Sequence, residues 1–161
     1  ATHRFFRMLQ QRHGVACHAQ PSGDLGHRMA SAMQAHFQRH PGQPLIIVGT
    51  DCPALTPAHL QQAADALQGN DAVLIPAEDG GYVLIGLARP LPVVFERVDW
   101  STDRVLAQTR ERLNEAGATW QELPTLWDVD EPADWERLQR WQASATTPGA
   151  SPFPAAHPAR S

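Results

Sequence analysis

Residues 45–57 read LIIVGTDCPALTP, and this stretch indicates the class of fold. Its first four residues are apolar without alternation, which is typical of a β-strand covered on both faces, as in a central parallel sheet. A turn follows, and Thr56-Pro57 then shows the cap-and-proline pattern that begins a helix. The stretch therefore predicts a strand, a turn and a helix, the unit from which layered α/β sheets are built.

The same alternation continues on both sides of this stretch. Asp24 is a candidate N-cap for a helix that ends near Arg39 and buries one face, because its apolar residues recur every four positions. Such alternation predicts an α/β fold with a largely parallel sheet, in which ligands bind beyond the carboxyl ends of the strands. The other expected elements are a helix at 3–13, strands at 15–19, 72–75, 82–87 and 119–123, a helix capped by Ser101 or Thr102, and a helix from Pro132.

The composition predicts one domain at residues 1–142 and a tail rich in proline, alanine and serine at 143–161. The net charge of −4 gives no reason to expect a nucleic-acid or membrane partner. Without a long apolar stretch or a signal peptide, a cytoplasmic protein is expected. The sequence has thirteen arginines and no lysine, which excludes a catalytic lysine. Cys52 is expected to be a packing residue.

A carboxylate follows the first buried strand. Asp51 comes two residues after Gly49, which leaves room beside it at the carboxyl end of the strand. Mg²⁺ and Mn²⁺ take oxygen ligands and keep waters or phosphates in their remaining positions. Asp51 is therefore a candidate metal ligand. The alternative is that it caps the turn at the end of the strand.

Two acids and two glycines separate the next two predicted strands. Their order is Glu78, Asp79, Gly80 and Gly81, and Tyr82 begins the second strand. An Asp-Gly pair favours a hairpin turn, which is the simpler interpretation. The functional alternative is that the glycines let the backbone approach a substrate while Asp79 or Glu78 orients a hydroxyl.

Two more aspartates stand just before the last predicted helix. Asp128 and Asp130 alternate in an extended segment, so both side chains point to the same side. Carboxylates in that arrangement can bind a metal or act as a general base. The alternative is helix capping and dipole pairing by Asp130, Glu131 and Asp134.

Two weaker patterns lie nearer the N-terminus. Gly23 and Asp24 form a turn that opens a helix, where backbone amides favour anions, although Arg28 is expected to be solvated. His36 and His40 have a spacing that could bind a metal. A solvated helix face is the expectation for this pair, because no acid has a matching spacing.

Taken in order, five segments resemble the bacterial GT-A-like glycosyltransferase family of the nucleotide-diphospho-sugar transferase superfamily. Some members of that family are assigned to arsenosugar biosynthesis. The resemblance covers about residues 23–140, and the set is specific because all five segments occur in order. They read GDLGHRM, VGTDCPALTPAHL, PAEDGGYVLIGL, WST and DVDEPADW.

The resemblance implies a three-layer, Rossmann-like GT-A fold. It implies that Asp51 and Asp130 hold the metal and that Gly23 and Asp24 lie near the nucleotide. The acceptor or sugar pocket would be lined by Glu78, Asp79, Gly80, Gly81 and Tyr82. The family's first strand and its loop with the Lys-Thr-Arg phosphate contacts have no counterpart here, so the sheet is expected to lack its N-terminal strand. Glu131 replaces the family's usual threonine before Pro132, and glutamate is a poorer cap.

Three hypotheses follow for function. The leading one is a metal-dependent glycosyltransferase that uses a nucleotide-diphospho-sugar donor, with Mg²⁺ or Mn²⁺ on Asp51 and Asp130 and with Asp79 or Asp128 as the base. The second is a nucleotidyltransferase that acts on a phosphorylated small molecule with the same metal. The third is a non-catalytic remnant that serves as a binding or assembly module. In that case an uncovered strand edge would favour a homo-oligomer.

Overall fold

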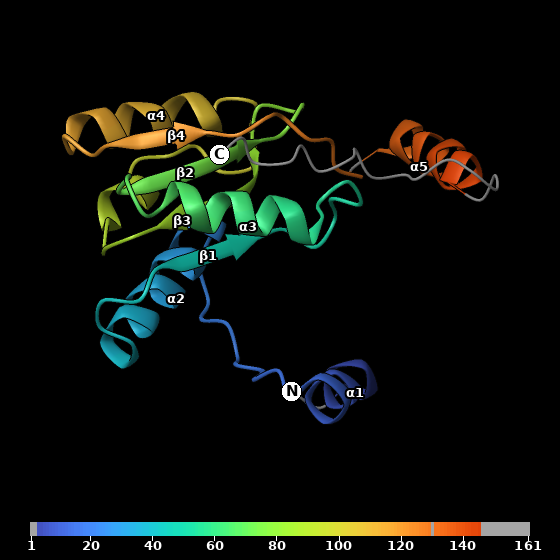
Figure 1. Ribbon diagram of the computed structural model, residues 1–161, viewed down its shortest axis with the longest axis horizontal. Coiled ribbons are helices and arrows are strands. Elements are labelled where there is room, and N and C mark those ends of the chain that lie inside the picture. The colour runs from blue at the N-terminus through green and yellow to red at the C-terminus, as the bar shows by residue number, and fades with distance from the viewer. Residues whose placement is uncertain (1–2, 130, 146–161) are drawn as a thin grey trace, which may run out of the picture.

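The computed structural model describes residues 3–129 and 131–145, and these form a layered α/β fold (Figure 1). A four-stranded sheet stands at its centre, in the order β1-β3-β2-β4. The strands are β1 (Leu45–Val48), β2 (Ala72–Pro76), β3 (Tyr82–Leu87) and β4 (Trp120–Glu122). The helices are α1 (Arg4–His13), α2 (Leu25–Arg39), α3 (Pro57–Ala66), the short 3-10 helix η1 (Pro92–Phe95), α4 (Val105–Glu115) and α5 (Pro132–Ala145).

Both faces of the two inner strands are covered, which gives three layers. Leu74 of β2 and Ile85 of β3 pack in one apolar cluster with residues of α2, η1 and α4. Val73 of β2 and Leu84 of β3 pack in a second cluster, with Ala63 of α3. Since successive side chains of a strand point to opposite faces, a continuous apolar run is what two covered faces require. The predictions of an α/β fold and of buried strands at 72–75 and 82–87 are confirmed.

The expectation of a mostly parallel sheet is not confirmed. Strands β1, β2 and β4 run in one direction, but β3 runs against them, so β1–β3 and β2–β3 pair antiparallel and only β2–β4 pairs parallel. The reason lies in the connection at residues 77–81, which is too short for the crossover that a parallel neighbour needs. The Asp79-Gly80 pair forms the tight reversal that such a short connection allows.

The placement of the first strand differs from the prediction. The apolar run of β1 indicates a central strand, yet in the described part of the chain β1 lies at the edge and pairs with β3 alone. As a result Val48 is 41% exposed. The segment at 15–19, predicted as a short strand, has no regular structure.

Local chemistry explains where helices α2 and α3 begin. Asp24 caps α2 by accepting a hydrogen bond from the His27 amide at 2.7 Å. Thr56 and His59 form a reciprocal capping box at the start of α3. The cap expected at Ser101 or Thr102 is wrong, because α4 begins at Val105 after Arg104, which makes no side-chain capping bond.

The two end helices lie apart from the sheet (Figure 1). No residue of α1 is buried. Helix α5 begins at Pro132 as predicted and continues to Ala145, so it includes the first three residues of the predicted tail. Residues 146–161, the rest of that tail, lie outside the described residues. Within the described residues, no helix has the length and apolar character needed to cross a membrane.

Candidate functional site

A pocket of about 750 Å³ lies at the carboxyl ends of β1 and β2. The turn between β2 and β3, the segment before α4, the first turns of α2 and the end of β1 all contribute to its wall. Apolar side chains such as Met29, Ile47 and Ile85 form part of the lining. Among the described residues, its charged lining consists of Asp51, Asp79, Asp103, Asp128 and Arg28. The lining thus combines acidic and apolar side chains.

Asp51 stands where the sequence predicts it, beyond the end of β1. Gly49 leaves room for its carboxylate, since a Cβ atom at Gly49 would lie 2.6 Å from Asp51 Oδ1. The backbone carbonyl of Asp51 accepts a hydrogen bond from the Val129 amide at 3.0 Å. That bond brings the segment of Asp128 to the end of β1, and both aspartates line the same pocket.

The turn after β2 is packed against the segment before α4. The amide of Gly81 donates to Asp79 Oδ1 at 2.8 Å, which orients that carboxylate at the pocket. Gly80 has a φ of 92°, and a Cβ atom there would lie 2.2 Å from the backbone oxygen of Asp103. The Leu106 amide also donates to the Gly80 carbonyl at 2.8 Å. Glycine is therefore needed at position 80 for a close approach between two walls of the pocket.

Glu78 faces α5 and is not among the residues that line the pocket. Its two carboxylate oxygens accept hydrogen bonds from Arg137 at 2.6 and 3.0 Å. These hydrogen bonds from the guanidinium lower the pKa of Glu78. Gly23, Asp24 and Gly80 are likewise outside the lining, whereas Gly81 and Tyr82 belong to it.

Asp51 and Asp130 are the two residues of the metal prediction. Asp51 lines the pocket, and Asp130 lies outside the described residues. Across 3–129 and 131–145, no three histidine, cysteine, aspartate or glutamate side chains form a group that could hold a metal ion. The negatively charged side chains in the described lining are carboxylates, and carboxylates are the hard oxygen ligands that suit Mg²⁺ or Mn²⁺.

Comparison with known proteins places the chain in a family. The family described as "Uncharacterized protein conserved in bacteria (DUF2064)" matches residues 1–102, more than half of the 161 residues. The chain belongs to this family. No match was found among curated proteins.

The DUF2064 chain is also similar to a solved structure. That protein, from Desulfovibrio desulfuricans G20, is described as a "putative nucleotide-diphospho-sugar transferase". The two are 34% identical with a TM-score of 0.73, over 84% of this chain. The chain spans 59% of the length of that protein. The resemblance found in the sequence is thus supported at the level of the superfamily and the α/β fold. Assignment to arsenosugar biosynthesis and the absence of the N-terminal nucleotide loop stay predictions.

The segment before α4 contributes residues of the DUF2064 chain that the sequence patterns did not assign to a site. Trp100, Ser101, Thr102 and Asp103 all line the pocket, although the sequence drew attention only to the motif Trp-Ser-Thr. The indole of Trp100 packs on Gly26, where a Cβ atom would lie 2.2 Å from Nε1. Ser101 has a φ of 63°, which is unusual for a residue other than glycine and is more common at functional sites. Arg28 lines the pocket too, and it is exposed, as the sequence predicts.

Two side chains of the DUF2064 chain that burial perturbs are not bases at neutral pH. Burial raises the pKa of Tyr82, whose hydroxyl lies beside Thr109 under α4 while the residue also lines the pocket. Burial likewise raises the pKa of the Cys52 thiol, which is 9% exposed. Both groups therefore stay protonated, and Cys52 is the packing residue that its sequence context predicts.

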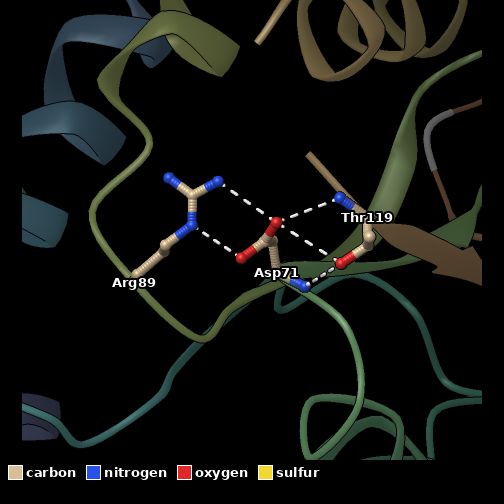
Figure 2. A network of polar contacts seen from close by, with 3 residues as sticks. All are labelled: Asp71, Arg89 and Thr119. Carbon is tan, nitrogen blue, oxygen red and sulfur yellow. Dashed lines mark hydrogen bonds and ion pairs between the residues drawn. The ribbon is translucent and has the colours of Figure 1, made fainter. Parts of the chain in front are cut away.

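A single carboxylate with several hydrogen-bond donors lies at the opposite end of the sheet. Figure 2 shows Asp71, just before β2, between Arg89 and Thr119. The guanidinium of Arg89 donates to both carboxylate oxygens at 2.6 and 3.1 Å, and the Thr119 amide donates at 3.0 Å. These hydrogen bonds, led by the one from Arg89, lower the pKa of Asp71 to about 2.

Proposed function

We propose that this chain is the core of a metal-dependent transferase domain that binds a nucleotide-diphospho-sugar. The observation that carries the proposal is the convergence of Asp51, Asp79 and Asp128, from three separate segments, on one pocket at the carboxyl ends of β1 and β2. The similarity to the Desulfovibrio desulfuricans protein supports the ligand class. Glycosyl transfer by the whole protein is part of the same proposal.

The charges of the pocket argue for a cation. A diphosphate would face four carboxylates and one guanidinium among the described lining residues. Like charges repel, so a pocket with this excess of carboxylates would disfavour a bare diphosphate. A divalent cation would reverse that effect and supply charge neutralisation to the leaving diphosphate. Asp51, Asp128 and Asp130 are the residues proposed to hold it.

The remaining groups have separate roles in the proposed reaction. Asp79, oriented by the Gly81 amide, is the candidate base that removes a proton from the acceptor hydroxyl. Asp128 is the alternative base in a site where Asp51 and Asp130 alone hold the cation. Arg28, in the first turn of α2, offers five N–H donors to the pocket and would bind a phosphate oxygen. The apolar wall with Trp100 would hold the less polar part of the ligand and exclude water from it.

Replacement of Asp51 by asparagine tests this proposal. The change removes one negative charge and one hard oxygen ligand but keeps the shape of the side chain. We expect the binding of Mn²⁺ with UDP, GDP or ADP to weaken at least tenfold, as measured by titration calorimetry. Asp65→Asn on α3 is the matched control, because the Asp65 carboxylate lies outside the pocket and accepts a hydrogen bond from the neighbouring Gln61.

The outcome also separates the alternatives. Binding of all three nucleotides that is equal in wild type and Asp51→Asn would reject the metal site. Release of pyrophosphate from a nucleoside triphosphate, in place of a nucleoside diphosphate from a sugar donor, would favour the nucleotidyltransferase. If the wild-type protein binds none of these ligands with Mn²⁺, the binding or assembly module is the hypothesis that remains.

A further inference from the structure

One segment of main chain joins the two strand ends that carry the pocket carboxylates. The Glu78 amide donates to the Leu126 carbonyl at 3.1 Å, and the Val129 amide donates to the Asp51 carbonyl at 3.0 Å. The segment at 126–129 is therefore hydrogen-bonded to the end of β2 at one side and to the end of β1 at the other. Asp128 lies between these two attachments.

Arg137 of α5 holds the same segment from outside the pocket. Its guanidinium makes two hydrogen bonds to Glu78, at 2.6 and 3.0 Å, and its Cζ atom lies 4.6 Å above the ring of Trp127. Trp127 is only 8% exposed and meets Trp141 edge to face at 6.4 Å. One side chain thus contacts the residue before Asp79 and the residue before Asp128.

A simple surface ion pair does not account for this arrangement. Exposed ion pairs contribute little to stability, because water screens them and two long side chains lose freedom. Here the pairing is bidentate, which fixes the angle between the partners, and the guanidinium also lies over an aromatic ring. Arg137, Glu78 and Trp127 are all absent from the pocket lining, so any effect on ligands must pass through their neighbours.

We propose that Arg137 is a positioning residue, which fixes the turn of Asp79 and the segment of Asp128 relative to each other at the pocket. The effect on cation binding rests on the function proposed above, whereas the effect on the two segments does not. Groups that orient metal ligands from outside commonly change metal affinity 10- to 100-fold when they are removed. The proposal gives α5, which otherwise lies apart from the sheet, a role at the site (Figure 1).

The test uses the whole chain with Arg137→Met, which keeps the aliphatic stem and removes the guanidinium. Hydrogen exchange of the Glu78 and Val129 amides is expected to become at least tenfold faster. Affinity for Mn²⁺ alone, measured by electron paramagnetic resonance of the free ion, is expected to fall about tenfold. Arg140→Met is the matched control, because its contact with Glu136 at 3.8 Å is exposed and lies on the same helix. It should leave both measurements unchanged.

Two more variants exclude a purely structural explanation. Glu78→Gln removes the ion pair but leaves the contact with Trp127, so it should show part of the effects of Arg137→Met. The double variant should not exceed Arg137→Met, since Glu78 acts through Arg137. Arg137→Lys keeps the charge without the bidentate fork. Its exchange rates should lie between those of the wild type and Arg137→Met, even if α5 unfolds in Arg137→Met. Unchanged exchange in Arg137→Met, or wild-type behaviour of Arg137→Lys, would overturn the proposal. If the wild type binds no Mn²⁺, the proposed function fails, and the exchange rates still decide the role of Arg137.

Discussion

The two ends of the sheet use aspartates in opposite ways. At the end where β2 begins, Asp71 is enclosed by donors from Arg89 and Thr119. At the other end, Asp51, Asp79 and Asp103 line a pocket, and none of them forms an ion pair within the described residues. A carboxylate that already has its donors stabilises the fold. Clustered carboxylates that form no ion pair cost stability and are available to a ligand or a cation.

The same difference appears in the backbone. The Asp71 network joins the starts of β2 and β4 to the end of β3, with ordinary strand geometry on each side. The pocket end relies on two left-handed residues, Gly80 and Ser101, and on a contact that only glycine permits. Strained backbone persists where the surrounding structure enforces it, and such positions cluster at binding sites. The comparison therefore predicts different responses to substitution at the two ends.

The largest effect is expected at Gly80, where the pocket end has no tolerance for a side chain. In Gly80→Ala the new Cβ would lie 2.2 Å from the Asp103 backbone oxygen, and alanine would have to adopt a φ of 92°. Overpacking and backbone strain each cost about 1–3 kcal/mol, so we expect a loss of about 3 kcal/mol in the free energy of unfolding. Denaturation in urea, followed by circular dichroism, measures it.

Gly42→Ala separates the two causes. Gly42 also has a positive φ, 79°, but a Cβ atom added there would meet nothing within 4 Å, so this variant reports the backbone cost alone. We expect it to lose about 1 kcal/mol. Equal losses in the two variants would show that the walls of the pocket can move apart. The contrast between a rigid pocket and an ordinary turn would then fail.

A smaller effect is expected at the opposite end, from Asp71→Asn. The Arg89 hydrogen bonds keep the pKa of Asp71 at about 2, below its ordinary 3.8. The carboxylate therefore stabilises the fold above about pH 4, and this contribution is lost as the pH falls toward 2. Because the Asp71 side chain is 25% exposed and Arg89 is 48% exposed, solvent screening reduces it. We expect Asp71→Asn to lose about 1 kcal/mol at pH 7 and almost nothing at pH 2.

Unfolding in urea at pH 7, 4, 3 and 2 tests whether the contribution of Asp71 to the free energy of unfolding disappears as the pH falls. Arg89→Met should show the same pH dependence, since it removes the other half of the pair. A difference between Asp71→Asn and wild type that stays constant from pH 7 to pH 2 would contradict an electrostatic role for Asp71. The network would then act through packing or through the hydrogen bonds of Thr119 alone.

Local sequence patterns predicted much of this molecule. The caps at Asp24 and Thr56, the room that Gly49 leaves for Asp51, and the buried strands β2 and β3 each depend on residues close in sequence. Such features can be predicted from sequence because each depends on a few neighbouring residues whose local preferences agree. The turn of Asp79 is the hairpin that an Asp-Gly pair favours, and it also lines the pocket. The contact of Asp79 or Glu78 with a substrate hydroxyl stays a prediction.

Long-range contacts could not be predicted. Nothing near Glu78 indicates that Arg137, 59 residues later, is its partner. The direction of β3 and the edge position of β1 depend on which strands pair, and an apolar run does not specify that. The contact of Trp100 with Gly26 is a similar case, because the sequence does not show which side chain fills the space over a glycine in a helix. A glycine inside a predicted helix is the one signal that could have drawn attention to it.

The smallest effect, and the sharpest comparison with Asp71, is expected from Asp103→Asn. Asp103 shares the pocket with three other carboxylates in the described residues, so neutralising it relieves repulsion and breaks no ion pair found there. We expect a gain of up to about 0.5 kcal/mol at pH 7 and low salt, which disappears near 1 M salt because the Debye length falls to about 3 Å. Urea unfolding at the two salt concentrations measures it. A loss of 1 kcal/mol or more would mean that Asp103 stabilises the fold as Asp71 does, and the division between a structural and a ligand-binding end would no longer hold.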